Sequence, residues 1–466
     1  MYVCPVKTHL TMNTSAFNRE QSLKKFRMSE IRNIFNTFLH NESAGGIVLI
    51  ACTALAIIAA NFGPMTGFNA IWDKEMGFTI GDFSLSMSLL HWVNDGLMAI
   101  FFFVVGLEIK REMMVGELSS IKHAALPVFA AIGGIIAPAL IYAAFNSGNP
   151  LTEKGWGIPM ATDIAFAIGI ISLMGKRVPL ALKVMLTALA IVDDLGAIVV
   201  LALFYPSHEL HLVFLLYAAA IVAGLAIMNF LNIRNKYVFM IAGLFLWYFV
   251  YMSGVHATIA GVLLAAVTPA RSVINELRFG TKLQYMIDKF KMAGDSRVEV
   301  LANPEQQHII HSMHSMINKA DPLMHKFEST LHPWVTFFIM PVFALANAGV
   351  AINATAMDFS GGIPSVSMGI LLGLLLGKPA GIFLFSFLAV KTGAAKKPQG
   401  INWGQILSVG ILGGIGFTMS IFINNLAFAD ESIIDLGKLT IIITSLFAAI
   451  LGLASLLLTC RKQKKQ

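Results

Sequence analysis

The chain has 466 residues, of which 56% are hydrophobic and only 13% are charged. Soluble domains carry about 25% charged residues, so this composition excludes an ordinary soluble protein and predicts a polytopic membrane protein. The net charge of +7 does not indicate nucleic-acid binding, because the lysines and arginines lie mainly in alternate loops, as membrane orientation requires.

The twelve apolar segments are each expected to form a membrane helix, because hydrophobicity all round at this length excludes strands and soluble helices. In chain order they are 44–62, 88–107, 121–145, 156–174, 179–204, 211–231, 237–254, 256–270, 333–350, 365–391, 404–428 and 433–459. The first eight lie within 41–270 and the last four within 333–459. Basic residues before the first segment and after every second one predict that both termini are cytoplasmic.

The ends and the cysteines carry less information. Residues 1–40 are polar and mildly basic, which predicts a cytoplasmic N-terminal segment without a cleaved signal peptide. Residues 460–466 form a basic cytoplasmic tail. Cys4, Cys52 and Cys460 match neither a metal site nor a disulfide framework, so no cofactor is expected.

Two connections have structure of their own. Residues 78–86 predict a short external hairpin with Gly81 and Asp82 at or near its turn. The long cytoplasmic loop 271–332 predicts one amphipathic helix that begins at Asn303-Pro304 and lies on the membrane surface or a cytoplasmic face. Three histidines recur beside its apolar stripe, where solvated positions are a better interpretation than a metal site or pH sensor: His308, His311 and His314.

Two segments look interrupted. The fourth contains Pro159 and the polar pair Thr162-Asp163, and the eleventh contains four clustered glycines at 410–416. Unwound backbone is tolerated at membrane depth only inside protein or beside a cavity. Glycines alone could instead serve close helix packing. Because interrupted segments occur in both halves of the chain, unwinding is favoured, and such pairs mark transporter binding sites.

Five ionisable residues lie well inside the apolar segments: Asp95, Asp163, Asp193, Asp194 and Lys378. Each such charge costs about 2.5–3.5 kcal/mol on insertion scales. Structural ion pairing accounts for Lys378 with one partner. It leaves three acids that need protons or other cations.

The adjacent pair Asp193-Asp194 organises this set. Successive side chains on a helix diverge by about 100°, so one is expected to face an ion cavity and the other Lys378. Where two interrupted helices cross, Asp163 would offset the positive half-helix ends and Lys378 the negative ones. Carboxylates and carbonyls are hard oxygen ligands, and neighbouring acids titrate as a coupled group. Competition between a proton and a small cation, with alternating access, gives antiport.

Several long motifs carry a resemblance to a known family. They are NDGLMAIFFFVVGLEIKRE (94–112), ATDIAFA (161–167), IVDDLGA (191–197), SGVHATIAGV (253–262), LHPWV (331–335), FALANAGV (343–350), LGKPAGI (376–382) and GGIGFTMSIFI (413–423). In this order, over about 36–270 and 326–455, the chain resembles the bacterial NhaA-type sodium/proton antiporters. The resemblance implies inverted repeats and two interrupted helices, the fourth and the eleventh, that cross near mid-membrane.

The resemblance also implies roles for particular residues. Asp194 would be the principal carboxylate for Na⁺ and protons, and Asp193 would pair with Lys378 and join in the exchange. Asp163 and Thr162 would sit at the helix crossing. Asp95 would line the approach to the site.

The resemblance further implies an electrogenic exchange of Na⁺ or Li⁺ for protons across the inner membrane, without ATP, that is active at alkaline pH. The residues that it assigns to the pH response are Glu108, Arg111, Glu112, His256, Glu328 and His332. Family members commonly dimerise through an external hairpin, which the segment 78–86 would provide. Two departures fall at the cytoplasmic entrance: the loop 271–325 is long for the family, and Ser329 stands where a histidine often follows the acid.

Three other functions were weighed. A proton-coupled transporter of a small organic substrate would need a roomy polar or aromatic pocket, and it is the main alternative. An intramembrane aspartyl protease would need a Gly-x-Gly-Asp segment, which neither Asp163 nor Asp193 has, so no enzyme is expected. A channel fits poorly, because paired carboxylates and a lysine on broken helices favour tight binding over rapid conduction.

Overall fold

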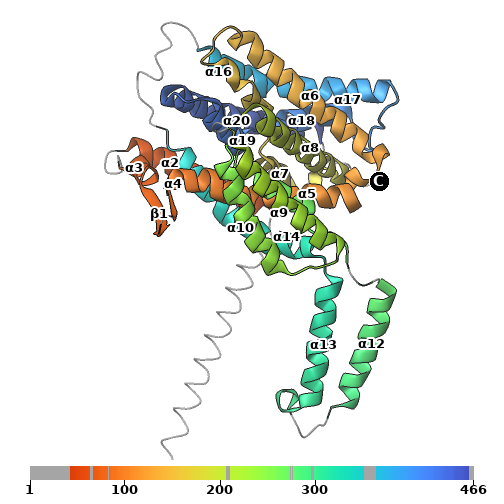
Figure 1. The fold of residues 1–466 in the computed structure, drawn as a ribbon. Coiled ribbons are helices and arrows are strands. Elements are labelled where there is room, and N and C mark those ends of the chain that lie inside the picture. The colour runs from red at the N-terminus through yellow and green to blue at the C-terminus, as the bar shows by residue number, and fades with distance from the viewer. Residues whose placement is uncertain are drawn as a thin grey trace, which may run out of the picture.

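A computed structural model describes residues 42–62, 67–81, 83–205, 210–272, 274, 276–294, 299–350 and 364–460. These residues form a bundle of crossing helices, from which one pair, α12 and α13, projects (Figure 1). The predictions for residues 1–40, for Asp82 and for the basic tail after Cys460 lie outside the described residues.

The first half of the chain supplies the elements up to α11. They are α2 (Glu42–Asn61), α3 (Phe68–Trp72), β1 (Glu75–Ile80), β2 (Phe83–Ser88), α4 (Leu89–His91), the π-helical η2 (Trp92–Leu97), α5 (Met98–Val115), η3 (Glu117–Ser119), α6 (Ile121–Asn146), the 3₁₀-helical η4 (Glu153–Met160), α7 (Ile164–Leu173), η5 (Gly175–Arg177), α8 (Leu180–Phe204), α9 (Leu212–Phe230), α10 (Lys236–Met252) and α11 (Ile259–Val267).

The second half begins with the projecting pair. It comprises α12 (Glu276–Met292), η6 (Val300–Ala302), α13 (Pro304–Ala320), α14 (Leu323–Trp334), the π-helical η7 (Val335–Ile339), α15 (Met340–Asn347), α16 (Ser365–Leu372), the π-helical η8 (Gly373–Gly377), α17 (Lys378–Lys391), α18 (Trp403–Gly413), α19 (Phe417–Ala427) and α20 (Glu431–Thr459).

The structure is that of an all-α polytopic membrane protein. Within the described ranges, nine helical segments are long and apolar enough to cross a membrane, or ten if the bent pair α18 and α19 counts as one span. The seventh predicted segment is a helix of 17 residues and the eighth a helix of only nine. The count of twelve crossings stays a prediction.

The helical segment that corresponds to the ninth predicted segment, 333–350, begins at Leu323, ten residues earlier than predicted. The apolar stretch from 333 set the predicted start, because the residues before it are more polar. In the structure Pro333 lies inside α14, and a π-helical stretch, η7, follows it directly. The boundary predicted at 332 therefore falls within a continuous helical segment.

The predicted hairpin is confirmed, whereas its external location stays a prediction. Strands β1 and β2 pair antiparallel from Glu75↔Ser88 to Ile80↔Phe83. Gly81 follows β1 with φ +60°, a conformation that suits glycine. The indole N–H of Trp92 donates to the carbonyl of Met76 at 2.7 Å, which ties the hairpin to the start of the second membrane segment.

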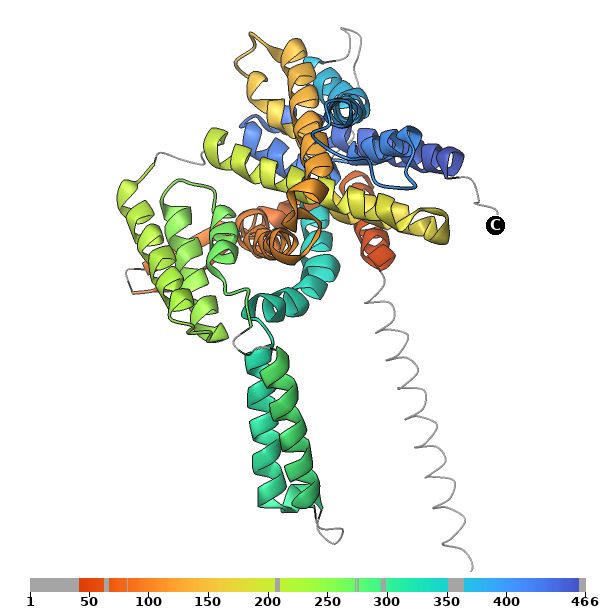
Figure 2. The ribbon, with the colours of Figure 1, turned by 90° about the vertical axis from the view of Figure 1, so that its right-hand side faces the viewer.

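The long loop contains two helices, where the sequence predicted one. Asn303 caps α13 through the backbone N–H groups of the next helical turn, with Pro304 at the first position, as predicted. Helix α12 packs against α13, and together they stand away from the bundle (Figure 2). The sequence of α12 is amphipathic, so it has an apolar face for this pairing.

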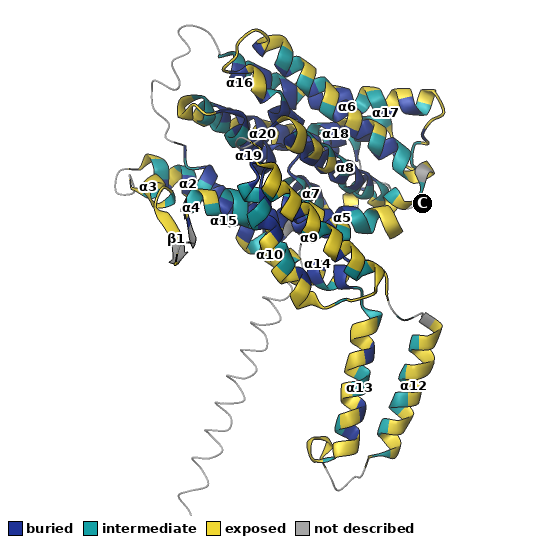
Figure 3. Ribbon diagram, in the orientation of Figure 1, coloured by how far each residue is buried: buried dark blue, intermediate teal, exposed yellow. Residues whose placement is uncertain are grey.

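Much of the surface of this hairpin is exposed (Figure 3). Ile309 and Met316 are buried against α12, whereas Ile310 and Ile317 are 37% and 50% exposed. The buried stripe of α13 is therefore narrower than predicted. Its three histidines are exposed.

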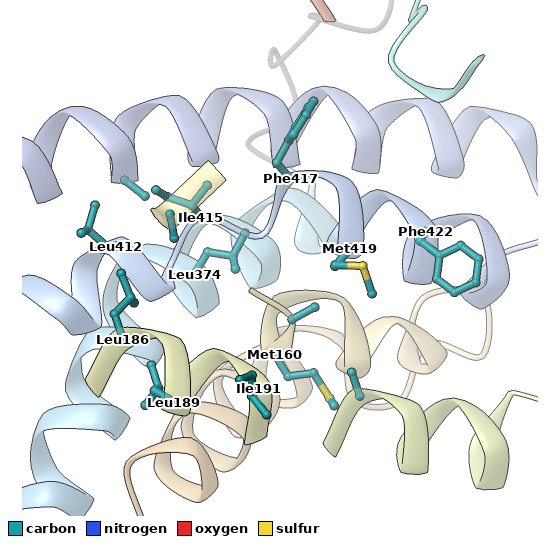
Figure 4. Packing of buried hydrophobic residues seen from close by; sticks show 14 of the residues in the cluster. Met160, Leu186, Leu189, Ile191, Leu374, Leu412, Ile415, Phe417, Met419 and Phe422 are labelled. Carbon is teal, nitrogen blue, oxygen red and sulfur yellow. The ribbon is translucent and has the colours of Figure 1, made fainter. Parts of the chain in front are cut away.

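The interior of the bundle brings the interrupted segments together. Buried apolar residues from η4, α8, η8, α18 and α19 pack around the breaks, among them Met160, Leu189, Leu374 and Ile415 (Figure 4). Helices α6 and α17 approach so closely that a Cβ on Gly381 would collide with the carbonyl oxygen of Gly133. This contact fixes the start of α17, where Lys378 lies.

Candidate ion-binding site

The site forms where two helical segments break. Residues 161–163 separate η4 from α7, and residues 414–416 separate α18 from α19, which are bent by 46°. The backbone N–H of Asp163 donates to the carbonyl of Ile415 at 2.7 Å, so the two breaks touch. The hydroxyl of Ser420 adds a bond to the carbonyl of Ile158 at 2.8 Å.

Asp163 caps two helices at once. Its carboxylate accepts the Phe166 N–H of α7 at 2.9 Å. It also accepts the N–H of Thr418 at 3.2 Å and the Thr418 hydroxyl at 2.5 Å, at the start of α19. The negative charge of Asp163 thus meets the positive ends of both half-helices.

Lys378 lies beside the negative groups at the same crossing. Its ammonium donates to the carbonyl of Met160, the last residue of η4, and to Asp193 Oδ2 at 2.5 Å. Thr162 joins this group, because its hydroxyl donates to Asp193 Oδ2 at 2.5 Å and lies 3.0 Å from the carbonyl of Gly413. Lys378 and Asp193 are 0% and 1% exposed, so the pair is fully desolvated.

The side chain of Asp194 lies on a different face of α8 from that of Asp193. Neither of its carboxylate oxygens has a hydrogen-bond partner among the described residues, although the residue is only 1% exposed. Asp194 and Asp163 both line a cavity of about 860 Å³. Helix geometry left open which aspartate would face Lys378, the family resemblance implied Asp193, and Asp193 lies there in the structure.

The cavity widens toward a polar mouth, lined by Glu108, Arg111, Glu112, Glu117, His123 and His332. Arg111 bridges Glu328 at 2.5 Å and Glu112 at 3.3 Å. His332 Nε2 lies 3.8 Å from Glu108 Oε1, a pair that is ionic only when the histidine is protonated. Five of the six residues assigned to the pH response therefore meet at this mouth.

Asp95 and His256 lie elsewhere. Neither lines the cavity. Asp95 belongs to η2, and its backbone carbonyl accepts the indole N–H of Trp247 at 2.9 Å. His256 is buried just before α11. Their roles in access and in the pH response stay predictions.

Sequence reasoning missed several polar groups at the crossing. Thr418 and Ser420 are fully buried in α19, and the Ser445 hydroxyl of α20 accepts the N–H of Phe417 at 3.1 Å. The signal was present for the first two, because hydroxyl residues directly follow the glycine cluster in GGIGFTMSIF. Ser445 lies in an unremarkable apolar helix, so only the fold shows its contact.

Among the described residues, no group of three or more His, Cys, Asp or Glu side chains is arranged to hold a metal ion. The site is instead two buried carboxylates at a cavity, one lysine and several backbone carbonyls. These features define a polytopic membrane transporter with a buried, charged site at a helix crossing.

Comparison with known proteins places the chain within one family. The family model for Na⁺/H⁺ antiporter 1 matches residues 36–456, and the chain belongs to this family. A Na⁺/H⁺ antiporter NhaA of Oleidesulfovibrio alaskensis is 47% identical over 433 residues, which make up 92% of this chain and 95% of that protein. The same antiporter of Wolinella succinogenes is 44% identical over 94% of this chain and 95% of its own length. That of Helicobacter pylori strain J99 is 46% identical over 89% and 93%.

Proposed function

We propose that this protein exchanges Na⁺ or Li⁺ for protons across the bacterial inner membrane. The observation that carries the proposal is the unequal pair in α8: Asp193 is neutralised by Lys378, whereas Asp194 is buried at the cavity and has no hydrogen-bond partner in the described part of the chain. A buried carboxylate without a partner is costly unless a proton or a cation occupies it. The family membership of the chain supports the same exchange.

Asp194 binds a proton or a cation in competition, and Asp163 lies on the same cavity wall. A cation beside Asp194 also weakens the attraction between Asp193 and Lys378, so this pair joins in proton release. Asp194 and the Lys378 ammonium each release a proton, so more than one proton moves for each cation and the exchange is electrogenic. Alternating access then couples the two fluxes.

The exchange is off at acid pH and on at alkaline pH. The mouth of the cavity supports this, because His332 and Glu108 pair ionically only while the histidine carries a proton. Arg111 holds Glu328 and Glu112 in the same group. Loss of protons from this cluster changes the charge along the path that a cation follows.

Both termini face the cytoplasm, and the mouth of the cavity opens on that side. The basic loops predicted from the sequence support this orientation. The chain forms homodimers through its external hairpin, β1 and β2, which has exposed residues such as Glu75 and Met76 and is tied to the membrane segments at Trp92.

The test is an exchange assay in everted membrane vesicles with an acid interior and a fluorescent pH probe. Na⁺, Li⁺ or K⁺ is added at several pH values to vesicles with the wild type, Asp194→Asn or Asp193→Asn. We expect Na⁺-driven dequenching in the wild type that rises with pH and is lost in Asp194→Asn. Asp435→Asn is the matched control, because Asp435 is an exposed acid away from the site.

Two results would contradict the proposal. A full Na⁺ response in Asp194→Asn would remove Asp194 from the ion site. No response to any cation by correctly inserted wild-type protein would favour the alternative, a proton-coupled transporter of a small organic substrate.

A further inference from the structure

Three helical segments (η2–α5, α15 and α19) contribute phenylalanine and asparagine side chains beyond the end of the cavity that lies away from its polar mouth. Met340 of α15 and Met419 of α19 line its depth. One helical turn further along the same helices lie Phe343 and Phe422, neither of which lines the cavity. Figure 4 shows Met419 and Phe422 on successive turns of α19.

Phe102 of α5 completes a layer of phenyl rings. The ring of Phe422 lies 5.6 Å from that of Phe102 and 6.3 Å from that of Phe343, between centroids. All three residues are at most 1% exposed. A dry aromatic layer at this position separates the cavity from the opposite end of the bundle.

A second layer, of asparagine side chains, comes from the same three segments. Asn347 lies one turn beyond Phe343, Asn425 one turn beyond Phe422, and Asn94 in η2 on the segment that carries Phe102. Asn347 and Asn94 exchange hydrogen bonds of 2.9 and 3.3 Å. The Asn425 amide donates to Asn347 Oδ1 at 2.7 Å. Asn347 is therefore the hub of the layer.

The asparagines of this layer differ in how firmly their helices are held by further hydrogen bonds. The end of α15 is tied down further, because Asn61 donates to the carbonyl of Val350 at 2.8 Å and Asn69 to that of Gly349 at 3.0 Å. By contrast, Asn425 contributes one hydrogen bond, and its carbonyl oxygen has no partner among the described residues.

Helix α19 connects this layer to the ion site. Thr418, at its first turn, holds Asp163, and Asn425, near its last turn, holds Asn347. The two ends of one short helix thus contact the site and the barrier. Any shift of α19 that accompanies a change at Asp163 acts on the Asn425–Asn347 bond.

We propose that the Asn425–Asn347 hydrogen bond is a latch that keeps the end of the bundle opposite the cavity mouth closed, with the phenyl layer as its seal. The latch rests on the proposed function, because an antiporter must open this end once in each cycle. A bond between two neutral amides suits the task, since its net strength is small and water replaces it when the helices part.

The first test is a reversible cross-link. Asn347→Cys and Asn425→Cys are combined in a parent in which the native cysteines are replaced by serine: Cys4, Cys52 and Cys460. After disulfide formation, or reaction with a short reducible bis-thiol reagent, we expect Na⁺-driven exchange to fall at least tenfold and to recover on reduction. The matched control is Asn94→Cys with Asn347→Cys, which joins η2 to α15 and leaves exchange within twofold.

The outcomes separate the latch from the proposed function. If the cysteine-free parent does not exchange Na⁺ for protons, the proposed function fails. If the parent exchanges and the cross-linked Asn347–Asn425 pair exchanges equally well, the latch is refuted. Equal inhibition by the control cross-link would also refute it, because the barrier would then not open between α15 and α19. Failure of the pair to cross-link would contradict the contact itself.

A second measurement removes the latch. Met340→Cys places a thiol at the depth of the cavity, and a membrane-impermeant thiol reagent is added from the side opposite the mouth. With Asn425→Ala we expect labelling to become several-fold faster than with Asn425 intact. An unchanged rate would show that Asn425 does not hold this end closed. Asn69→Ala, which removes an exposed amide bond to Gly349, is the matched control and leaves the rate unchanged.

Discussion

Lys378→Met tests the electrostatics of the crossing. The substitution keeps most of the side-chain volume and removes the ammonium that lies 2.5 Å from Asp193 Oδ2. At an effective dielectric constant of about 20, the lost attraction is about 7 kcal/mol before desolvation is counted. Both groups are at most 1% exposed, so the aspartate would remain as an uncompensated buried charge. Breaking such a pair costs about 3–5 kcal/mol.

The assay is thermal unfolding of the purified protein in detergent, followed for the wild type, Lys378→Met, Asp193→Asn and the double variant. We expect Lys378→Met to unfold at the lowest temperature. The double variant should regain most of the loss, because replacing both charges removes the unpaired group. We expect Na⁺-driven exchange to remain impaired in the double variant.

Two outcomes would refute this reasoning. Equal unfolding temperatures for Lys378→Met and the wild type would mean that the pair is not desolvated as the structure shows. A double variant that is less stable than both single variants would mean that Lys378 acts mainly through the carbonyl of Met160, not through Asp193.

Three further changes test other contacts. Thr418→Val removes a charge-assisted hydrogen bond to Asp163, which is worth about 1.5–3 kcal/mol. The half-maximal Na⁺ concentration in the vesicle assay should therefore rise about tenfold, whereas with Thr418→Ser it should stay within twofold. Equal effects of the two substitutions would show that the Thr418 hydroxyl does not contribute to the ion site. Lys110→Met removes the donor to three carbonyl oxygens at the C-terminal end of α11 and should lower the unfolding temperature. Lys110→Arg should unfold at a temperature between those of Lys110→Met and the wild type. An unchanged unfolding temperature in Lys110→Met would mean that this cap does not contribute to stability. Gly81→Val places a β-branched residue at φ +60°, which costs about 1–2 kcal/mol. The fraction of dimer in native mass spectrometry should therefore fall with Gly81→Val and stay unchanged with Gly81→Asn. An unchanged dimer fraction in Gly81→Val would mean that the hairpin is not part of the dimer interface.

The amino-acid sequence determined the class of the protein and the content of its site. All-round hydrophobicity in long segments leaves only membrane helices, and charges within them are too costly to be incidental. The divergence of Asp193 and Asp194 followed from helix geometry alone. The β1–β2 hairpin was predictable because its turn and its strands are neighbours in the chain.

Helix geometry alone did not decide which aspartate meets Lys378; the family resemblance implied Asp193, and the tertiary structure shows the contact. Helical periodicity gives the angle between two side chains, but what lies opposite each depends on segments 185 residues away. The second helix of the long loop was missed although α12 has an amphipathic pattern of its own, and only the tertiary structure shows that its partner is α13. The asparagine layer joins residues up to 253 positions apart, and each asparagine by itself reads as a polar residue near a helix end. Local pattern therefore specified which groups are buried, and long-range packing specified which of them meet.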